Sequence, residues 1–118
     1  MKLYYFDIYG RAEPLRILLW HAKAEFEDVR IKGEEWPKLR ADNPEKFEFG
    51  QLPMLEVDGV FLSQSNSLLR YLGKRFGYYP IGAYESWQAD SIIDSIADLL
   101  ANIIKAMSES DPEKKKEL

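Results

Sequence analysis

A hairpin signal in the middle of the chain constrains the fold more than any other feature. Asp58-Gly59 separates two short apolar runs, residues 54–57 and 60–62. An Asp-Gly pair favours a type I′ turn, because both central residues of that turn need positive φ. The sequence therefore predicts two antiparallel strands joined by a two-residue turn.

The segments on either side of this hairpin predict a binding site for a small acidic peptide. Leu52 stands just before Pro53, and its backbone N–H and C=O groups can pair with an extended peptide. After the hairpin, Ser63-Gln64-Ser65-Asn66 offers side chains that can cap a helix. Leucines follow at helical spacing, and the start of such a helix can bind a carboxylate.

The elements predicted around the hairpin give an α/β fold. In chain order they are a strand over 2–8, a helix from Pro14, a strand over 27–31, a short helix or irregular loop over 34–44, the hairpin, and a helix over 66–76. The order βαβ, connection, ββα implies a parallel pair with a right-handed crossover and an antiparallel edge. We predict a thioredoxin-like domain with a four-stranded mixed sheet.

The character of the chain changes after residue 77. A turn-rich linker over 78–84 leads into one long helical pattern over 83–107, whose apolar residues recur at spacings of three and four. This stripe is wide enough to need helical neighbours, and Asp111-Pro112 opens another helix. We predict a first, ligand-binding domain over 1–77 and the beginning of an all-helical domain over 85–118, which ends early.

Composition excludes several functions. The chain of 118 residues has no cysteine, one histidine (His21) and a formal charge of −4. A disulfide, a thiolate metal site and a protein thiol nucleophile are therefore excluded, and any sulfur chemistry needs a thiol carried by the ligand. The sequence contains no basic region that would predict a nucleic-acid partner. It also contains no apolar stretch long enough to predict a membrane span. We expect a cytoplasmic protein.

Tyr5 is a candidate functional residue near the end of the first strand. A tyrosine hydroxyl can donate a hydrogen bond to a ligand anion, and a donor aimed at a thiolate stabilises that anion. On position alone, a tyrosine of the core or of a strand edge is the more common interpretation.

Several motifs together resemble the cytosolic glutathione transferases of the tyrosine type, with sigma-like, pi-like and mu-like features. In chain order they are Lys2-Leu-Tyr-Tyr-Phe6, Gly10-Arg-Ala-Glu13, Glu35-Trp-Pro37, Phe49-Gly-Gln-Leu-Pro53, Glu56-Val-Asp-Gly59 and Gln64-Ser-Asn66. Each motif alone is weak, but their order is specific and the resemblance extends to about residue 100.

The resemblance implies roles for residues that would touch glutathione, the co-substrate. Tyr5 would hold the thiolate and Arg11 would supply positive charge near the sulfur. Trp36 would contact the glycyl end. The backbone of Leu52, before a cis Pro53, would pair with the cysteinyl part. These residues also have plainer interpretations, as a surface cation for Arg11 and a lid on the core for Trp36.

The same resemblance places the γ-glutamyl end of glutathione at Gln64 and Ser65, with Gln51 lining the site. Ser65 could equally be a helix N-cap. The family has a lysine that reaches the glycyl carboxylate, and the segment that should hold it looks longer here. Arg40 is the best match in position, and Lys46 is the second choice.

Three aspartates on the long helix, Asp90, Asp94 and Asp98, are spaced by four and share one face. Solvated surface is the simplest interpretation of Asp90. By resemblance, Asp98 would reach across a homodimer to the glutathione of the other subunit. Some sigma-like members bind a divalent cation at aspartates there, but Ala97 occupies one such position, and no metal is predicted.

The function that the resemblance implies is conjugation of glutathione to small electrophiles, as in detoxification, with isomerase or peroxidase chemistry as side activities. Two alternatives stay open: an inactive transferase-like structural or interaction module, and a glutaredoxin-type or thioredoxin-type oxidoreductase. The absence of cysteine argues against the oxidoreductase.

Overall fold

The computed structural model describes residues 1–117, and its chain divides into two compact units that meet between Tyr78 and Tyr79. The elements in chain order are β1 (Lys2–Phe6), the 3-10 helix η1 (Gly10–Ala12), α1 (Glu13–His21), β2 (Glu27–Ile31), α2 (Trp36–Asp42), β3 (Met54–Val57), β4 (Val60–Ser63), α3 (Ser65–Phe76), α4 (Ala83–Ser108) and α5 (Pro112–Glu117). The predicted βαβ-ββα order is confirmed, and the connection over 34–44 contains a helix.

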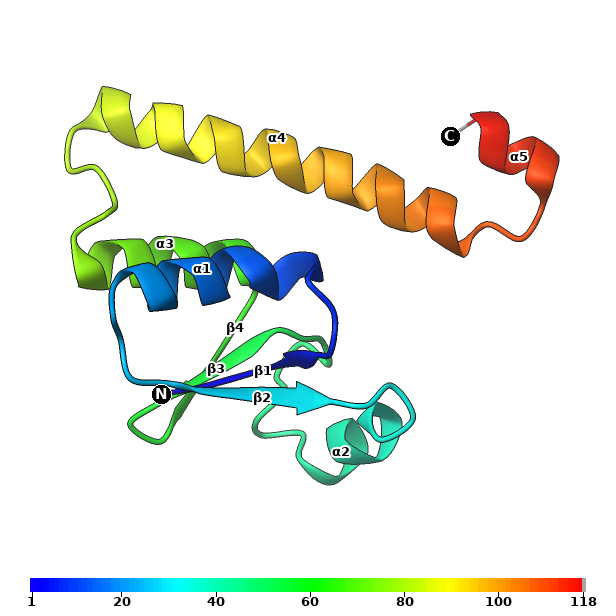
Figure 1. Ribbon diagram of the computed structural model, residues 1–118, viewed down its shortest axis with the longest axis horizontal. Coiled ribbons are helices and arrows are strands. Elements are labelled where there is room, and N and C mark those ends of the chain that lie inside the picture. Colours follow the sequence, from blue (N-terminus) through cyan, green and yellow to red (C-terminus); the bar gives the residue numbers. More distant parts are fainter. Residues whose placement is uncertain (118) are drawn as a thin grey trace. The chain divides into compact units, whose positions relative to one another are not determined.

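The first unit is built on a four-stranded mixed sheet in the order β2-β1-β3-β4. The central strand β1 runs parallel to β2 and antiparallel to β3. Helices α1 and α3 lie together on one face of the sheet, while α2 lies on the other side (Figure 1). The predicted thioredoxin-like plan is therefore confirmed.

The hairpin has the predicted turn, since φ is 50° at Asp58 and 78° at Gly59. The ladder runs from Val57 paired with Val60 at the turn to Met54 paired with Ser63 at the open end. The residues before β3 and after β4 therefore lie next to each other, although ten positions separate them in the sequence.

Leucines fill the core between the sheet and the two helices. Leu3 and Leu55 of the sheet, Leu19 of α1 and Leu72 of α3 are all 0% exposed. Burying one such side chain contributes about 1.5–3 kcal/mol. Helix α3 ends at Gly77, whose φ of 79° is the left-handed conformation that glycine adopts without strain.

One charged side chain, Arg16 of α1, is completely buried. Its guanidinium donates hydrogen bonds to the carbonyl oxygens of Phe6 and Ile8, at 3.2 and 2.7 Å, and to Asp28 at 3.2 Å. Glu13 accepts a further bond at 3.1 Å. Arg16 therefore ties the loop that follows β1 to both α1 and β2, and this loop leads directly into the candidate site.

The second unit consists of α4 and α5 in the described part of the chain. Although α4 carries the predicted apolar stripe, none of its residues is buried, and Ile92, Leu99 and Met107 are 60%, 58% and 73% exposed. The assignment of residues 85–118 to the start of an all-helical domain stays a prediction.

The interpretation of Asp90 as solvated surface is wrong. Its side chain is half-buried, and both carboxylate oxygens lie 2.9 Å from the hydroxyl of Tyr79, which donates to them. The tyrosine belongs to the segment before α4, so the spacing of the aspartates along the helix gave no sign of this partner.

Candidate functional site

One pocket in the first unit, with a volume of about 380 Å³, gathers most of the predicted site residues. Its lining residues are Phe6, Arg11, Trp36, Gly50, Gln51, Leu52, Pro53, Gln64 and Ser65. All of these except Phe6 and Gly50 were predicted from the sequence. Segments from four separate parts of the fold therefore converge on one cavity.

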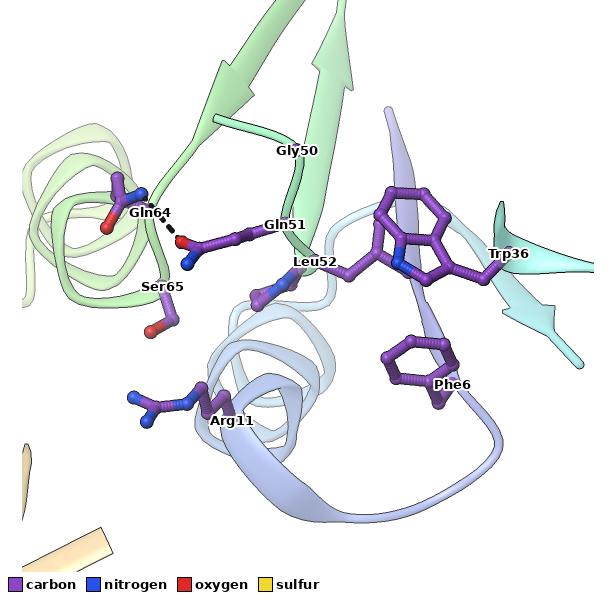
Figure 2. A pocket seen from close by; sticks show the side chains of 9 residues that line it. Phe6, Arg11, Trp36, Gly50, Gln51, Leu52, Gln64 and Ser65 are labelled. Atoms are coloured by element: carbon purple, nitrogen blue, oxygen red, sulfur yellow. Dashed lines mark hydrogen bonds between the residues drawn. The ribbon is translucent and has the colours of Figure 1, made fainter. Parts of the chain in front are cut away.

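The pocket has a polar end and an aromatic end (Figure 2). Gln51, Gln64 and Ser65 lie on one side together with Arg11, whereas Trp36 and Phe6 lie on the other. Arg11 is the charged residue among the nine described lining residues. The pocket can therefore take an elongated ligand with an anionic group at its polar end.

Tyr5 is not among the described lining residues of this pocket, although it contacts Arg11, which is. It is buried at 6% exposure, and its hydroxyl oxygen accepts a 3.1 Å hydrogen bond from the backbone N–H of Arg11. No hydrogen bond donated by this hydroxyl is found among the described residues, so its proton is available for a ligand. The Arg16 guanidinium carbon lies 5.7 Å from the centre of the Tyr5 ring.

Gly10 allows this close approach of loop and tyrosine. Its φ is +42°, and a Cβ at this position would come within 2.5 Å of the Tyr5 hydroxyl oxygen. An L side chain here would meet both backbone strain and a collision. The glycine therefore sets the position of the hydroxyl relative to Arg11.

The start of α3 forms the polar end of the pocket. The expected side-chain cap is absent among the described residues, because the N-cap is Gln64 and it makes no side-chain cap hydrogen bond, while Ser65 is already the first helical residue. The first intrahelical bond runs from the Leu68 N–H to the Gln64 carbonyl at 2.8 Å. The N–H groups of residues 65–67 therefore have no partner within the helix. They form the positive end of the helix dipole, which favours binding of an anion.

Gln64 adopts a strained backbone conformation at this point, with φ 76° and ψ 107°. Non-glycine residues in such regions cost about 1–3 kcal/mol and cluster at functional sites. Its side-chain amide donates a 3.2 Å hydrogen bond to the side-chain oxygen of Gln51 across the pocket (Figure 2). This pair joins the loop before β3 to the start of α3.

The predicted cis peptide bond between Leu52 and Pro53 is confirmed. Pro53 is buried, and Leu52 is half-buried at the pocket wall. The backbone of Leu52 thus stands at the open end of the hairpin, beside the start of α3.

The aromatic end is held by ring packing around Trp36. Its ring meets Phe6 edge-on at 6.2 Å and Phe47 edge-on at 4.9 Å. The Arg40 guanidinium carbon lies 6.0 Å from the Trp36 ring centre. Lys46 instead places its ammonium 5.6 Å from the ring of Phe61 on β4. Neither cation is among the described lining residues of the pocket, but Arg40 contacts Trp36, which does line it.

Asp98 is exposed on α4 and belongs to the second unit. Among the described residues, no group of three or more His, Cys, Asp and Glu side chains could hold a metal ion. No helix in the described part of the chain has the length and apolar character needed to cross a membrane.

Two lining residues were not predicted. Phe6 follows Tyr5 on β1, and strand alternation points it away from Tyr5, toward the face that α2 covers. This alternation was the signal available in the sequence, because it separates Phe6 from the face of Tyr5. Gly50 has φ +62°, and its place just before Gln51 in the predicted site loop was the corresponding signal.

The comparison with known protein families agrees with this geometry. Residues 1–74 match the model of the glutathione S-transferase N-terminal domain. The chain belongs to the glutathione S-transferase family.

Curated members of the family match nearly the whole chain. Glutathione S-transferase 1 of Ascaris suum is 43% identical over 96% of this chain and 56% of its own length. The hematopoietic prostaglandin D synthase of Gallus gallus is 41% identical over 84% of this chain and 50% of its own length. The chain spans about half the length of the curated relatives it matches.

Solved structures are similar to this chain in both sequence and fold. Prostaglandin synthase D of Nilaparvata lugens is 40% identical, with a TM-score of 0.86 over 98% of this chain and 56% of that one. A Nu-class transferase from Haemonchus contortus is 46% identical, with a TM-score of 0.75 over 86% of this chain and 48% of that one. The relatives are thus transferases of sigma-like and Nu classes.

Proposed function

We propose that this chain binds glutathione and holds its thiol as a thiolate for attack on electrophiles. The observation that carries the proposal is the convergence of Arg11, Trp36, Leu52, Gln64 and Ser65 on one pocket, with the backbone N–H of Arg11 bonded to the hydroxyl of Tyr5. Because the chain has no cysteine, the reacting sulfur comes from the ligand.

Tyr5 and Arg11 are the catalytic residues of this proposal. The Tyr5 hydroxyl accepts from the Arg11 N–H and donates its own proton to the sulfur, which lowers the thiol pKa of glutathione. The Arg11 guanidinium at the pocket wall adds a positive field. Stabilising the thiolate by one pKa unit requires about 1.4 kcal/mol.

The polar end suits the γ-glutamyl group. Its carboxylate would accept from the free N–H groups at the start of α3 and from the Ser65 hydroxyl, while Gln64 and Gln51 line the same end. The backbone of Leu52, before the cis Pro53, would pair with the cysteinyl residue as an added strand does.

The aromatic end suits the glycyl group. Trp36 would pack against it, and Arg40, which already lies over the Trp36 ring, would bind its carboxylate. Together, the two ends bind a tripeptide with an anionic group at each terminus.

The whole protein would act as a cytoplasmic homodimer in which Asp98 reaches the glutathione of the other subunit. Since a prostaglandin D synthase is among the relatives, isomerisation is a reaction to test beside conjugation.

Calorimetry with glutathione and ultraviolet absorbance of the bound thiolate test the proposal. Tyr5→Phe should keep glutathione affinity within a few-fold while reducing the thiolate fraction at neutral pH about ten-fold. The matched control is Tyr4→Phe on the neighbouring position, whose hydroxyl bonds to Glu56 instead. Equal thiolate absorbance in both variants would contradict the assignment of Tyr5.

Conjugation of a chromogenic aryl halide then separates the enzyme from its alternative. Turnover that falls in Tyr5→Phe supports a transferase. Glutathione binding with no turnover would instead favour a structural or interaction module of the same fold, and no glutathione binding at all would overturn the proposal.

A further inference from the structure

A second hollow in the first unit has no described lining residue in common with the first pocket. Its volume is about 630 Å³, within the range that holds a small organic molecule. The lining residues are Tyr4, Val29, Arg30, Ile31, Glu34, Glu35, Lys38, Leu39 and Asp42. The hollow is therefore formed by β1, β2, α2 and the turn before α2.

The floor of the hollow is apolar. Val29 and Ile31 project from the edge strand β2, and Leu39 faces them from α2. Ile31 is 5% exposed, while Val29 and Leu39 are half-buried. The ring of Tyr4 completes the floor, with its hydroxyl engaged by Glu56 at 3.0 Å.

The rim carries an excess of negative charge. Both cations at the rim are already paired: Lys38 with Asp42, and Arg30 with Asp7 at 2.7 Å. Arg30 also contacts Asp28 at 2.9 Å.

The glutamates at the rim, Glu34 and Glu35, differ from these cations because they are not paired within the described part of the chain. Both are exposed, and neither has an ion pair or a side-chain hydrogen bond among the residues that the structure describes. Two unpaired carboxylates thus stand at the mouth of an apolar cavity.

We propose that this hollow binds a small organic cation with an apolar body, such as an aromatic amine carried on a short alkyl chain. The apolar body packs on Val29, Ile31 and Leu39, and the ammonium lies between the carboxylates of Glu34 and Glu35. A neutral molecule of the same shape gains only the apolar contact, and an anion is repelled.

Three probes of similar shape separate the apolar contact from the effect of charge. They are tryptamine, which is a cation, the neutral alcohol tryptophol, and the anion indole-3-propionate. In amide-resolved NMR titrations of the 118-residue chain, tryptamine should shift Val29, Ile31 and Leu39 and bind at least ten times more tightly than tryptophol. Each carboxylate near an ammonium contributes about a five-fold preference in water. Indole-3-propionate should bind more weakly than tryptophol, and 0.5 M salt should reduce the preference for tryptamine.

A charge-matched pair of variants tests the role of the two glutamates. Glu34→Gln with Glu35→Gln should bring tryptamine within two-fold of tryptophol. The control, Glu25→Gln with Glu45→Gln, removes two exposed charges elsewhere and should leave the ten-fold preference. Equal binding of all three probes, an equal loss in the control, or shifts confined to other residues would each overturn the proposal. Glutathione should not compete with tryptamine for this hollow. The outcome of these titrations therefore does not depend on whether the chain binds glutathione as proposed.

Discussion

The two units of the chain differ in whether the apolar side chains of their helices are buried. In the first, α3 buries Leu68 and Leu72 against the sheet. In the second, α4 repeats apolar residues over 26 positions and buries none of them among the described residues. Apolar periodicity therefore predicts a helix in both units, whereas the stability of each depends on whether another surface covers the stripe.

The largest expected effect concerns the buried charge of the first unit. Arg16→Met should lower the free energy of unfolding by about 4 kcal/mol, because it leaves the carbonyl oxygens of Phe6 and Ile8 and the carboxylate of Glu13 without this partner. Asp28 would keep only Arg30. Chemical denaturation measures the change. A loss below about 1 kcal/mol would show that the Arg16 network is not what holds the loop after β1.

A pair of identical substitutions compares the two units directly. Leu55→Ala removes a side chain that is 0% exposed and should cost about 3 kcal/mol. Leu99→Ala on α4 removes one that is 58% exposed and should change stability by less than about 0.5 kcal/mol. Residue-resolved hydrogen exchange reports each unit separately. A cost above 1 kcal/mol at Leu99 would mean that another surface covers α4.

A smaller effect should have the opposite sign. Gln64→Gly relieves a backbone held at φ 76°, so it should stabilise the first unit by about 1 kcal/mol. The same change removes the amide that bonds to Gln51 and should weaken glutathione binding. Thermal unfolding and calorimetry measure the two changes, and Asp58→Gly, at φ 50° in the turn, is the control that relieves strain away from the pocket.

The smallest expected effect appears at high pH. Burial and the hydrogen bond to Glu56 raise the pKa of Tyr4 to about 12. Between pH 10 and 12 the unfolded chain therefore loses this proton before the folded chain does, and the free energy of unfolding falls as pH rises. The contribution is about 1 kcal/mol after solvent screening. The stability of Tyr4→Phe should fall less over this range, and an equal slope would contradict the assignment.

Local patterns were enough to predict the strands, the helices and the turn at Asp58-Gly59, because each depends on neighbours in the sequence. Most of the candidate site also followed, since six lining residues come from the segments that flank the hairpin. The network of Arg16 could not be predicted, because its acceptors come from β1, its following loop, α1 and β2. The strained φ of Gln64 and the bond from Tyr79 to Asp90 depend in the same way on tertiary packing.

The two ends of the β3–β4 hairpin also differ in how well they should tolerate substitution or insertion. Pocket residues of the proposed glutathione site flank its open end, while Asp58-Gly59 lies at the other end of four-residue strands, roughly 13 Å away. Both turn residues are exposed. A peptide tag, a fluorophore or a cysteine for immobilisation can therefore be inserted at this turn, where it would report on the protein without entering the pocket. Because the chain has no cysteine, such a thiol would be labelled at that position alone.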